Sequence, residues 1–150
     1  MQIALYCIYN DSDHYLLLLR SLSISMIRLL IIIGTGSFFG GITRFLTSRF
    51  IQQNVNSLFP FGTFVVNITG CFLIGLLYGL SERGNLMNAE WRMFLTVGFC
   101  GGFTTFSAFA NENMALLRDG NFFHFALYTS GSVFLGLMAT YIGNILIKAL

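Results

Sequence analysis

Hydrophobic residues along the 150-residue chain gather into four long stretches that are separated by shorter polar segments. The stretches cover residues 27–45, 61–80, 91–117 and 122–147, and the polar segments between them are residues 47–59, 81–90 and 118–121. A helix needs about 20 residues to cross the apolar layer of a membrane. The pattern therefore predicts an all-α integral membrane protein with four transmembrane helices.

The composition is typical of a protein that is embedded in lipid. Hydrophobic residues make up 55% of the chain and charged residues 9%, whereas a soluble domain carries about 25% charged residues. The net charge of +2 is too small and too scattered for a nucleic-acid-binding surface. We expect membrane lipid as a partner and no nucleic acid.

Residues 1–25 do not follow the pattern of the rest of the chain. Two short apolar runs there are interrupted by four polar residues, Asn10, Asp11, Asp13 and His14. Neither run is long enough to cross a membrane, and the segment lacks the features of a signal peptide. We expect residues 26–150 to form the membrane domain, with Met26 as the native start and residues 1–25 as an extension outside the fold.

Positive charges are nearly balanced between the two sides of the predicted membrane. One side carries Arg20, Arg28, Arg83, Arg92 and Lys148, and the other carries Arg44, Arg49 and Arg118. Without Arg20, which lies in the extension, the count is four against three. Because positive residues set the orientation of insertion, this small bias permits both orientations and hence an antiparallel dimer.

Glycines in the first two spans predict close helix packing. Gly36 and Gly40 lie four residues apart, as do Gly75 and Gly79. Residues at this spacing share one helix face, where the absence of a side chain lets another backbone approach.

Two polar side chains in or near the first two spans have more than one interpretation. Asn67 lies well inside the second span, where a carboxamide needs a partner and marks either a pathway or a helix contact. As a neutral donor, it suits an anion that must be released again. Arg44 ends the first span and either reaches toward the lipid headgroups or attracts anions into a vestibule; its charge alone favours the headgroups.

The residues of the third span are unfavourable for a continuous helix. Gly101 and Gly102 are followed by the hydroxyl residues Thr104, Thr105 and Ser107, which predicts a helix that is broken in the middle of the membrane. Such a break is tolerated only where protein buries it or where it lines a cavity. Carbonyl groups released at a break can bind a hard cation such as sodium.

Two phenylalanines follow this predicted break. Phe106 and Phe109 are three residues apart, so their rings share a helix face. The positive edge of an aromatic ring can contact an anion, although such a pair alone usually belongs to a core. The chain shows no nucleophile–base or acid–base arrangement, so we do not expect an enzyme.

Three motifs, in this order, resemble those of the CrcB/Fluc family of fluoride channels. They are GGITRF at residues 40–45, PFGTFVVNITG at residues 60–70 and GFCGGFTTFSAF at residues 98–109. The resemblance covers residues 26–150. The chain departs from the family at Gly41, where alanine is usual, and at Ala108, where the family usually has serine or threonine.

The resemblance implies a fluoride-specific channel that exports fluoride passively across the cell inner (plasma) membrane as an antiparallel, dual-topology homodimer with two pores. The implied fluoride path consists of Asn67, Thr105, Phe106, Ser107, Phe109, Tyr128 and Ser132, with Arg44 in the vestibule. It also implies a structural sodium ion (Na⁺) at the dimer centre, which is not transported and is held by the main-chain carbonyls of Gly101 and Thr104 from each subunit.

Two other functions compete with the channel. A proton-coupled small four-helix exporter needs a carboxylate deep in the first helix, and residues 27–45 contain none. Glu112 is the only acid of the third stretch, and we place it at a pore mouth or a helix contact. A membrane scaffold that transports nothing would explain the glycine packing but not Asn67 beside a hydroxyl-rich break.

Overall fold

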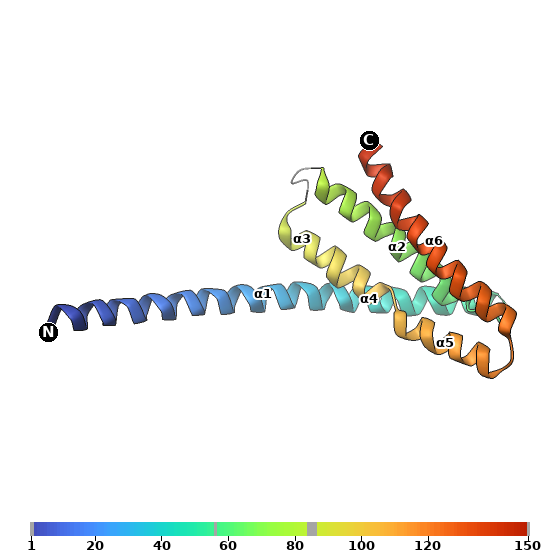
Figure 1. The fold of residues 1–150 in the computed structure, drawn as a ribbon, viewed down its shortest axis with the longest axis horizontal. Coiled ribbons are helices and arrows are strands. Elements are labelled where there is room, and N and C mark those ends of the chain that lie inside the picture. The colour runs from blue at the N-terminus through green and yellow to red at the C-terminus, as the bar shows by residue number, and fades with distance from the viewer. Residues whose placement is uncertain (1, 56, 84–86, 150) are drawn as a thin grey trace.

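The first helix, α1, spans Gln2–Asn54. The computed structural model of the chain describes residues 2–55, 57–83 and 87–149, with side chains from residue 25 onward. Figure 1 shows the N-terminal part of α1 projecting beyond the other helices. The helix passes through Met26 without interruption. Because the side chains of residues 1–24 lie outside the described residues, the separation of residues 1–25 from the fold stays a prediction.

The helix α1 continues past the predicted end of the first span. Residues 47–54, which we predicted to be part of a polar connecting segment, are helical, so that prediction is wrong. No glycine or proline, which would end a helix, occurs between Ile42 and Phe59. The side chain of Asn54 also turns back, and its Nδ2 donates to Phe50 O at 2.7 Å. A fall in hydropathy therefore does not by itself mark the end of the helix.

Three further spans follow α1. The helix α2 spans Phe61–Glu82, directly after Pro60, and α6 spans Phe122–Ala149. The third span lies between them and contains α3 (Ala89–Met93), the π-helix η1 (Phe94–Cys100), α4 (Gly101–Phe103) and α5 (Phe106–Arg118).

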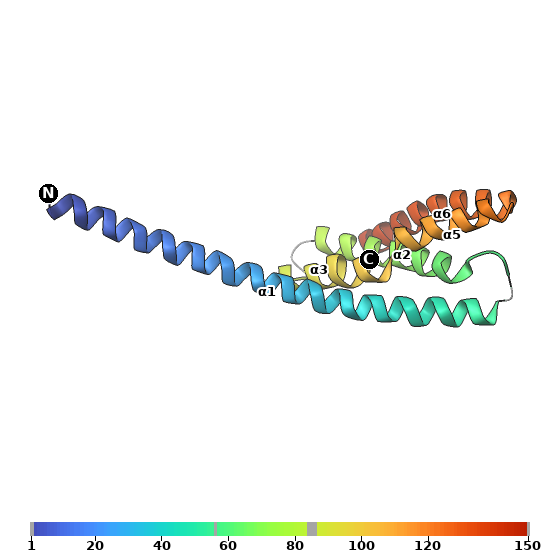
Figure 2. The same ribbon diagram turned by 90° about the horizontal axis from the view of Figure 1, so that it is seen from below.

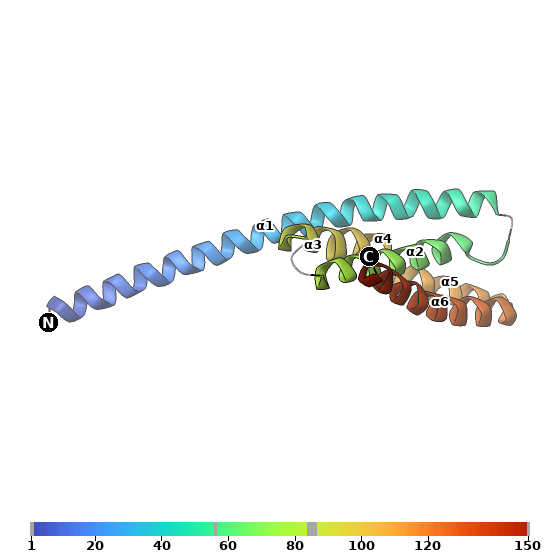
Figure 3. The same ribbon diagram turned by 90° about the horizontal axis from the view of Figure 1, so that it is seen from above.

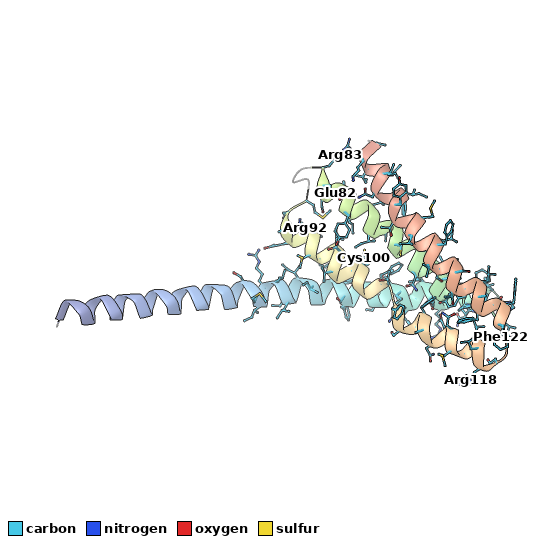
Figure 4. The ribbon with its side chains drawn as sticks, in the orientation of Figure 1. Glu82, Arg83, Arg92, Cys100, Arg118 and Phe122 are labelled. Carbon is cyan, nitrogen blue, oxygen red and sulfur yellow. The ribbon has the colours of Figure 1, made fainter. Side chains whose placement is uncertain are left out.

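Among the described residues, four helical stretches are long and apolar enough to cross a membrane: Ser25–Asn54, Phe61–Glu82, Ala89–Arg118 and Phe122–Ala149. They confirm the four predicted spans. Figure 4 shows Glu82, Arg83 and Arg92 near one end of the helix bundle and Arg118 near the opposite end. These four charged side chains thus lie near the ends of the spans, where water and headgroups can solvate them.

The helices form a bundle with α1 on one side and α6 on the other, and α2 lies between them (Figures 2 and 3). Glycines permit the close approach of α1 to the third span. A Cβ atom at Gly36 would lie 2.5 Å from Phe94 O, and a Cβ atom at Gly102 would lie 2.5 Å from Ser37 O. A Cβ atom at Gly40 would overlap Phe99 O. The packing role predicted for the glycines of α1 is confirmed.

Little of the apolar surface is buried inside a single subunit. In the most apolar window of each span, between 11% and 28% of the residues are buried. A cluster of buried residues joins Phe59, Leu116 and Tyr128. Because exposed apolar surface on this scale is unfavourable in water, lipid or another protein surface must cover it.

Candidate functional site

A pocket of about 430 Å³ lies between α2, the third span and α6. It brings together seven of the residues that the sequence analysis assigned to the fluoride path or the cation site: Asn67, Gly101, Thr104, Thr105, Phe106, Phe109 and Ser132. The other three assigned residues, Ser107, Tyr128 and Arg44, are not among the described residues that line it.

The third span is interrupted between α4 and α5. Thr104 (φ −87°, ψ 154°) and Thr105 (φ −148°, ψ 119°) are extended, and the helix resumes at Phe106. These two residues fall at the centre of the 30-residue span Ala89–Arg118. The helix is interrupted after the glycine pair and among the hydroxyl residues, as the sequence predicted. That the interruption lies in the middle of a membrane stays a prediction.

The side chain of Asn67 hydrogen-bonds the main chain of this break from α2. The Thr105 N–H donates to Asn67 Oδ1 at 2.9 Å, and Asn67 Nδ2 donates to Thr105 O at 3.2 Å. Because a main-chain N–H can only donate and a carbonyl can only accept, these two bonds fix which way the amide points. The Nδ2 group carries two hydrogens, so one donor remains for a ligand.

Thr105 caps the helix that follows the break. The Ala108 N–H donates to Thr105 Oγ1 at 3.2 Å, which is the geometry of a helix N-cap. The hydroxyls of Thr105 and Ser107 are also hydrogen-bonded, with 3.2 Å between their oxygens. Ser107 is exposed and reaches the pocket residues through this contact.

Aromatic rings continue from the pocket along α5 to α6. The ring centroids of Phe106 and Phe109 are 5.8 Å apart, and those of Phe109 and Tyr128 are 5.1 Å apart. Phe106 has 80% of its surface exposed, whereas Tyr128 is completely buried. The two phenylalanines therefore share a face, as the spacing predicted, and only Phe106 presents most of its ring to a potential ligand or partner.

A carboxylate joins three helices beside the pocket. Thr63 Oγ1 of α2 donates to Glu112 Oε1 at 2.6 Å, and the Tyr128 hydroxyl of α6 donates to Glu112 Oε2 at 2.7 Å. Of the two positions that we weighed for Glu112, the structure shows a helix contact. The sequence analysis missed Thr63, although it lies one helical turn before Asn67 and could have been found from that period.

Two polar atoms near the site have no hydrogen-bond partner among the described residues. Ser132 Oγ is buried and its residue lines the pocket. Arg44 Nε is also buried and unpaired, on a half-buried residue of α1. Ser132 therefore contributes to the pocket lining a residue whose hydroxyl forms no hydrogen bond with any described residue.

Comparison with known proteins identifies the family. The family model described as "CrcB-like protein, Camphor Resistance (CrcB)" matches residues 31–144, which is most of the chain. The chain belongs to the CrcB-like protein family. This confirms the resemblance that the three sequence motifs indicated.

Curated CrcB-like relatives match over nearly their full length. A protein of Flavobacterium psychrophilum named "Fluoride-specific ion channel FluC" is 48% identical over 118 residues, which cover 79% of this chain and 95% of the relative. Proteins of the same name from Bacteroides fragilis (48% identity, 78% of this chain, 94% of the relative) and Chlorobium phaeobacteroides (45% identity, 79% and 92%) are similar to it as well.

Proposed function

We propose that this protein is a fluoride-specific ion channel that lets fluoride leave the cell passively and so lowers cytoplasmic fluoride. The observation that carries the proposal is the 48% identity to a relative of that name across 95% of the relative's length. The family match over residues 31–144 includes the pocket and the break. The protein is a multi-pass membrane channel and not an enzyme.

The chemistry of the pocket supports a path for a small, strongly hydrated anion. A pore must replace the water around fluoride with several weak donors, because a strong positive charge would hold the ion too tightly for rapid exit. The free N–H of Asn67, the hydroxyl of Ser132 and the exposed edge of Phe106 supply such donors around one cavity. Thr105, Ser107, Phe109 and Tyr128 extend this path in the proposal, and Arg44 belongs to its vestibule.

The active form in this proposal is an antiparallel homodimer in the inner membrane. One subunit leaves the pocket open, with Phe106 and Gly101 exposed beside it, and a second subunit would complete its wall. The four-against-three balance of positive residues supports insertion in both orientations.

The dual orientation has a direct test in intact cells. Arg118→Cys is made in a background with Cys7→Ser, Cys71→Ala and Cys100→Ala, because Cys71 and Cys100 line the pocket. The cells are treated with a thiol reagent that does not cross membranes. About half of the protein should react from outside, since half of the subunits would present this end of the bundle there. Labelling of all or none of the protein would contradict the antiparallel dimer.

We also propose a structural sodium ion at the centre of the dimer, held by the carbonyls of Gly101 and Thr104. Both residues line the pocket, at the break. Within the described part of the chain, no residue donates a hydrogen bond to either carbonyl. Hard cations prefer such oxygen ligands, so the donor set fits the ion.

Proton-coupled export is the alternative, and the positions of the carboxylates count against it. The described side chains of α1 include no aspartate or glutamate, although such an exporter needs one there. Glu112 is the acid nearest the pocket, and it already accepts hydrogen bonds from Thr63 and Tyr128. A membrane scaffold would not explain a pocket that is lined by Asn67, Thr105 and Ser132.

Fluoride efflux from liposomes that contain the purified protein decides between these functions. A fluoride electrode should record rapid efflux that is selective over chloride and unchanged by an imposed proton gradient. Flux that follows the proton gradient would indicate coupled export. The absence of flux, or equal flux of chloride, would overturn the channel.

A further inference from the structure

The two carbonyls proposed to hold sodium have lost their helical donors to side chains. In an α-helix, the carbonyl of residue i accepts the N–H of residue i+4. The partner of Gly101 O would be the Thr105 N–H, which instead donates to Asn67 Oδ1 at 2.9 Å. The partner of Thr104 O would be the Ala108 N–H, which instead donates to Thr105 Oγ1 at 3.2 Å.

Carbonyls that precede Gly101 are already occupied. Cys100 O accepts both the N–H and the hydroxyl of Thr104, each at 2.9 Å. Gly98 O accepts the Gly101 N–H and the Ser37 hydroxyl. The break deprives the carbonyls of residues 101–104 of their helical donors. Of these four carbonyls, those of Gly101 and Thr104 have lost the donor to a side chain.

Asn67 also holds the released segment in place. Its amide pairs with both the N–H and the carbonyl of Thr105, as a neighbouring β-strand would. This pairing fits the extended conformation of Thr105 (φ −148°, ψ 119°). Without it, the Thr105 N–H would have Gly101 O as its nearest alternative acceptor, and α4 would continue by one residue.

We propose that Asn67 and Thr105 are positioning residues that create the cation site by withdrawing two N–H donors from its carbonyl ligands. The inference rests on the sodium ion proposed above and adds the side chains that make its ligands available. On this proposal Asn67 contributes to the binding of both ions. Its Oδ1 accepts the Thr105 N–H and so leaves Gly101 O available to the cation, and its remaining N–H belongs to the proposed fluoride path.

The test measures sodium affinity and not fluoride flux. The melting temperature of the full-length protein in detergent is recorded against sodium concentration, with N-methylglucamine keeping the ionic strength constant. A ligand that binds the folded state raises this temperature. Asn67→Leu and Thr105→Val should each raise the half-saturating sodium concentration by about tenfold, equivalent to about 1.4 kcal/mol, because sodium must then displace a restored hydrogen bond.

Two controls separate positioning from general destabilisation. Thr105→Ser keeps the capping oxygen and should keep the wild-type sodium midpoint. Asn113→Leu removes another intramembrane amide, which bonds Phe109 O and Thr129 Oγ1 and does not contact the break. That variant should melt at a lower temperature at every sodium concentration, with an unchanged midpoint.

The outcomes distinguish the two levels of the proposal. If sodium does not stabilise the wild-type protein, both the sodium ion and its positioning residues are overturned, while fluoride efflux still tests the channel. If sodium stabilises the wild type and the midpoints of Asn67→Leu and Thr105→Val do not move, only the positioning role is overturned. Should Asn67→Leu fail to fold, the comparison of Thr105→Val with Thr105→Ser decides alone.

Discussion

The two halves of the third span contact the rest of the protein through different parts of their residues, the first half mainly through main-chain atoms and the second half through side chains. The first half, residues 89–103, packs against α1 by direct contact of main chains. Gly98 and Gly102 of this half meet Gly36 and Ser37 of α1 at distances that leave no room for a Cβ atom. The position of this first half therefore depends on residues that have no side chain at the contact with α1.

The second half, α5, is held by polar and aromatic side chains. Glu112 accepts hydrogen bonds from Thr63 of α2 and Tyr128 of α6. Asn113 accepts another from Thr129 of α6 at 2.8 Å. Each of these hydrogen bonds depends on one particular polar atom. The second half should therefore be destabilised by substitutions that remove an atom, whereas the first half should be destabilised by substitutions that add one.

This difference shows how a broken helix can keep a defined geometry. The backbone contacts fix the first half against α1, and the hydrogen bonds align the second half with α2 and α6. Thr104 and Thr105 join the two halves, and Asn67 ties that junction to α2. Substitutions in the two halves should therefore act by different mechanisms.

The largest effect is expected at the glycine contact of α1. Gly40→Ala adds a Cβ atom that would overlap Phe99 O and lie 2.9 Å from Phe103 N. Main-chain atoms cannot turn aside, so we expect a loss of at least about 3 kcal/mol in folding free energy. The measurement is the yield of folded protein by size-exclusion chromatography and its melting temperature.

The neighbouring glycine provides the matched control. A Cβ atom at Gly41 would meet nothing within 4 Å in the subunit, and alanine favours helix by up to about 1 kcal/mol over glycine. Gly41→Ala should leave the melting temperature unchanged or slightly higher. Equal damage from both alanines would show that close backbone contact does not hold the first half.

A smaller effect is expected from the loss of a hydrogen bond in the second half. Tyr128→Phe removes one of the donors to Glu112 and leaves a carboxylate oxygen unpaired, which should cost about 1–3 kcal/mol. The melting temperature should fall, and Tyr141→Phe, an exposed tyrosine on the same helix, should leave it unchanged. If the two variants behave alike, the Glu112 contact does not hold α5 in place.

Phe106→Ile should change flux much more than stability. Phe106 is 80% exposed in the subunit, so little packing is lost within it. An aromatic contact worth about 1 kcal/mol corresponds to a roughly fivefold slower fluoride efflux. Phe122→Ile, at an exposed position at the start of α6, is the control, and unchanged efflux in both variants would remove Phe106 from the path.

The smallest effect is expected at an ion pair between α1 and α3. Arg28 Nη2 and Glu90 Oε1 are 2.8 Å apart, but the two side chains are 69% and 47% exposed. Exposed pairs contribute about 0–1 kcal/mol, so Glu90→Gln should barely shift the melting temperature. A large shift would mean that this pair, as well as the glycine contact, fixes the first half.

The sequence predicted the features that depend on local composition. Four apolar stretches located the spans, and the glycine pair with its hydroxyl neighbours located the break at Thr104 and Thr105. The end of α1 was placed too early, because polarity near residue 47 was taken for the end of the helix. Hydropathy describes the solvent around a segment and does not by itself describe its backbone.

Partners that come from distant segments could not be predicted. From its depth in the second span, Asn67 was predicted to mark either a pathway or a helix contact, and the family resemblance implied the fluoride path. Its bonds to Thr105 link residues 38 positions apart. The contact of Glu112 with Thr63 spans 49 positions. Such pairs depend on how the helices pack, which composition and period do not specify.

The carbonyl oxygens at the break have a genetic consequence. They belong to the main chain, so no single codon change can delete the oxygen of Gly101 or Thr104. On our proposal, substitutions affect these oxygens through the residues that position them, and Asn67 and Thr105 are two such residues. Natural substitutions that abolish the cation site should therefore be sought first at residues that, on our proposal, do not contact the ion.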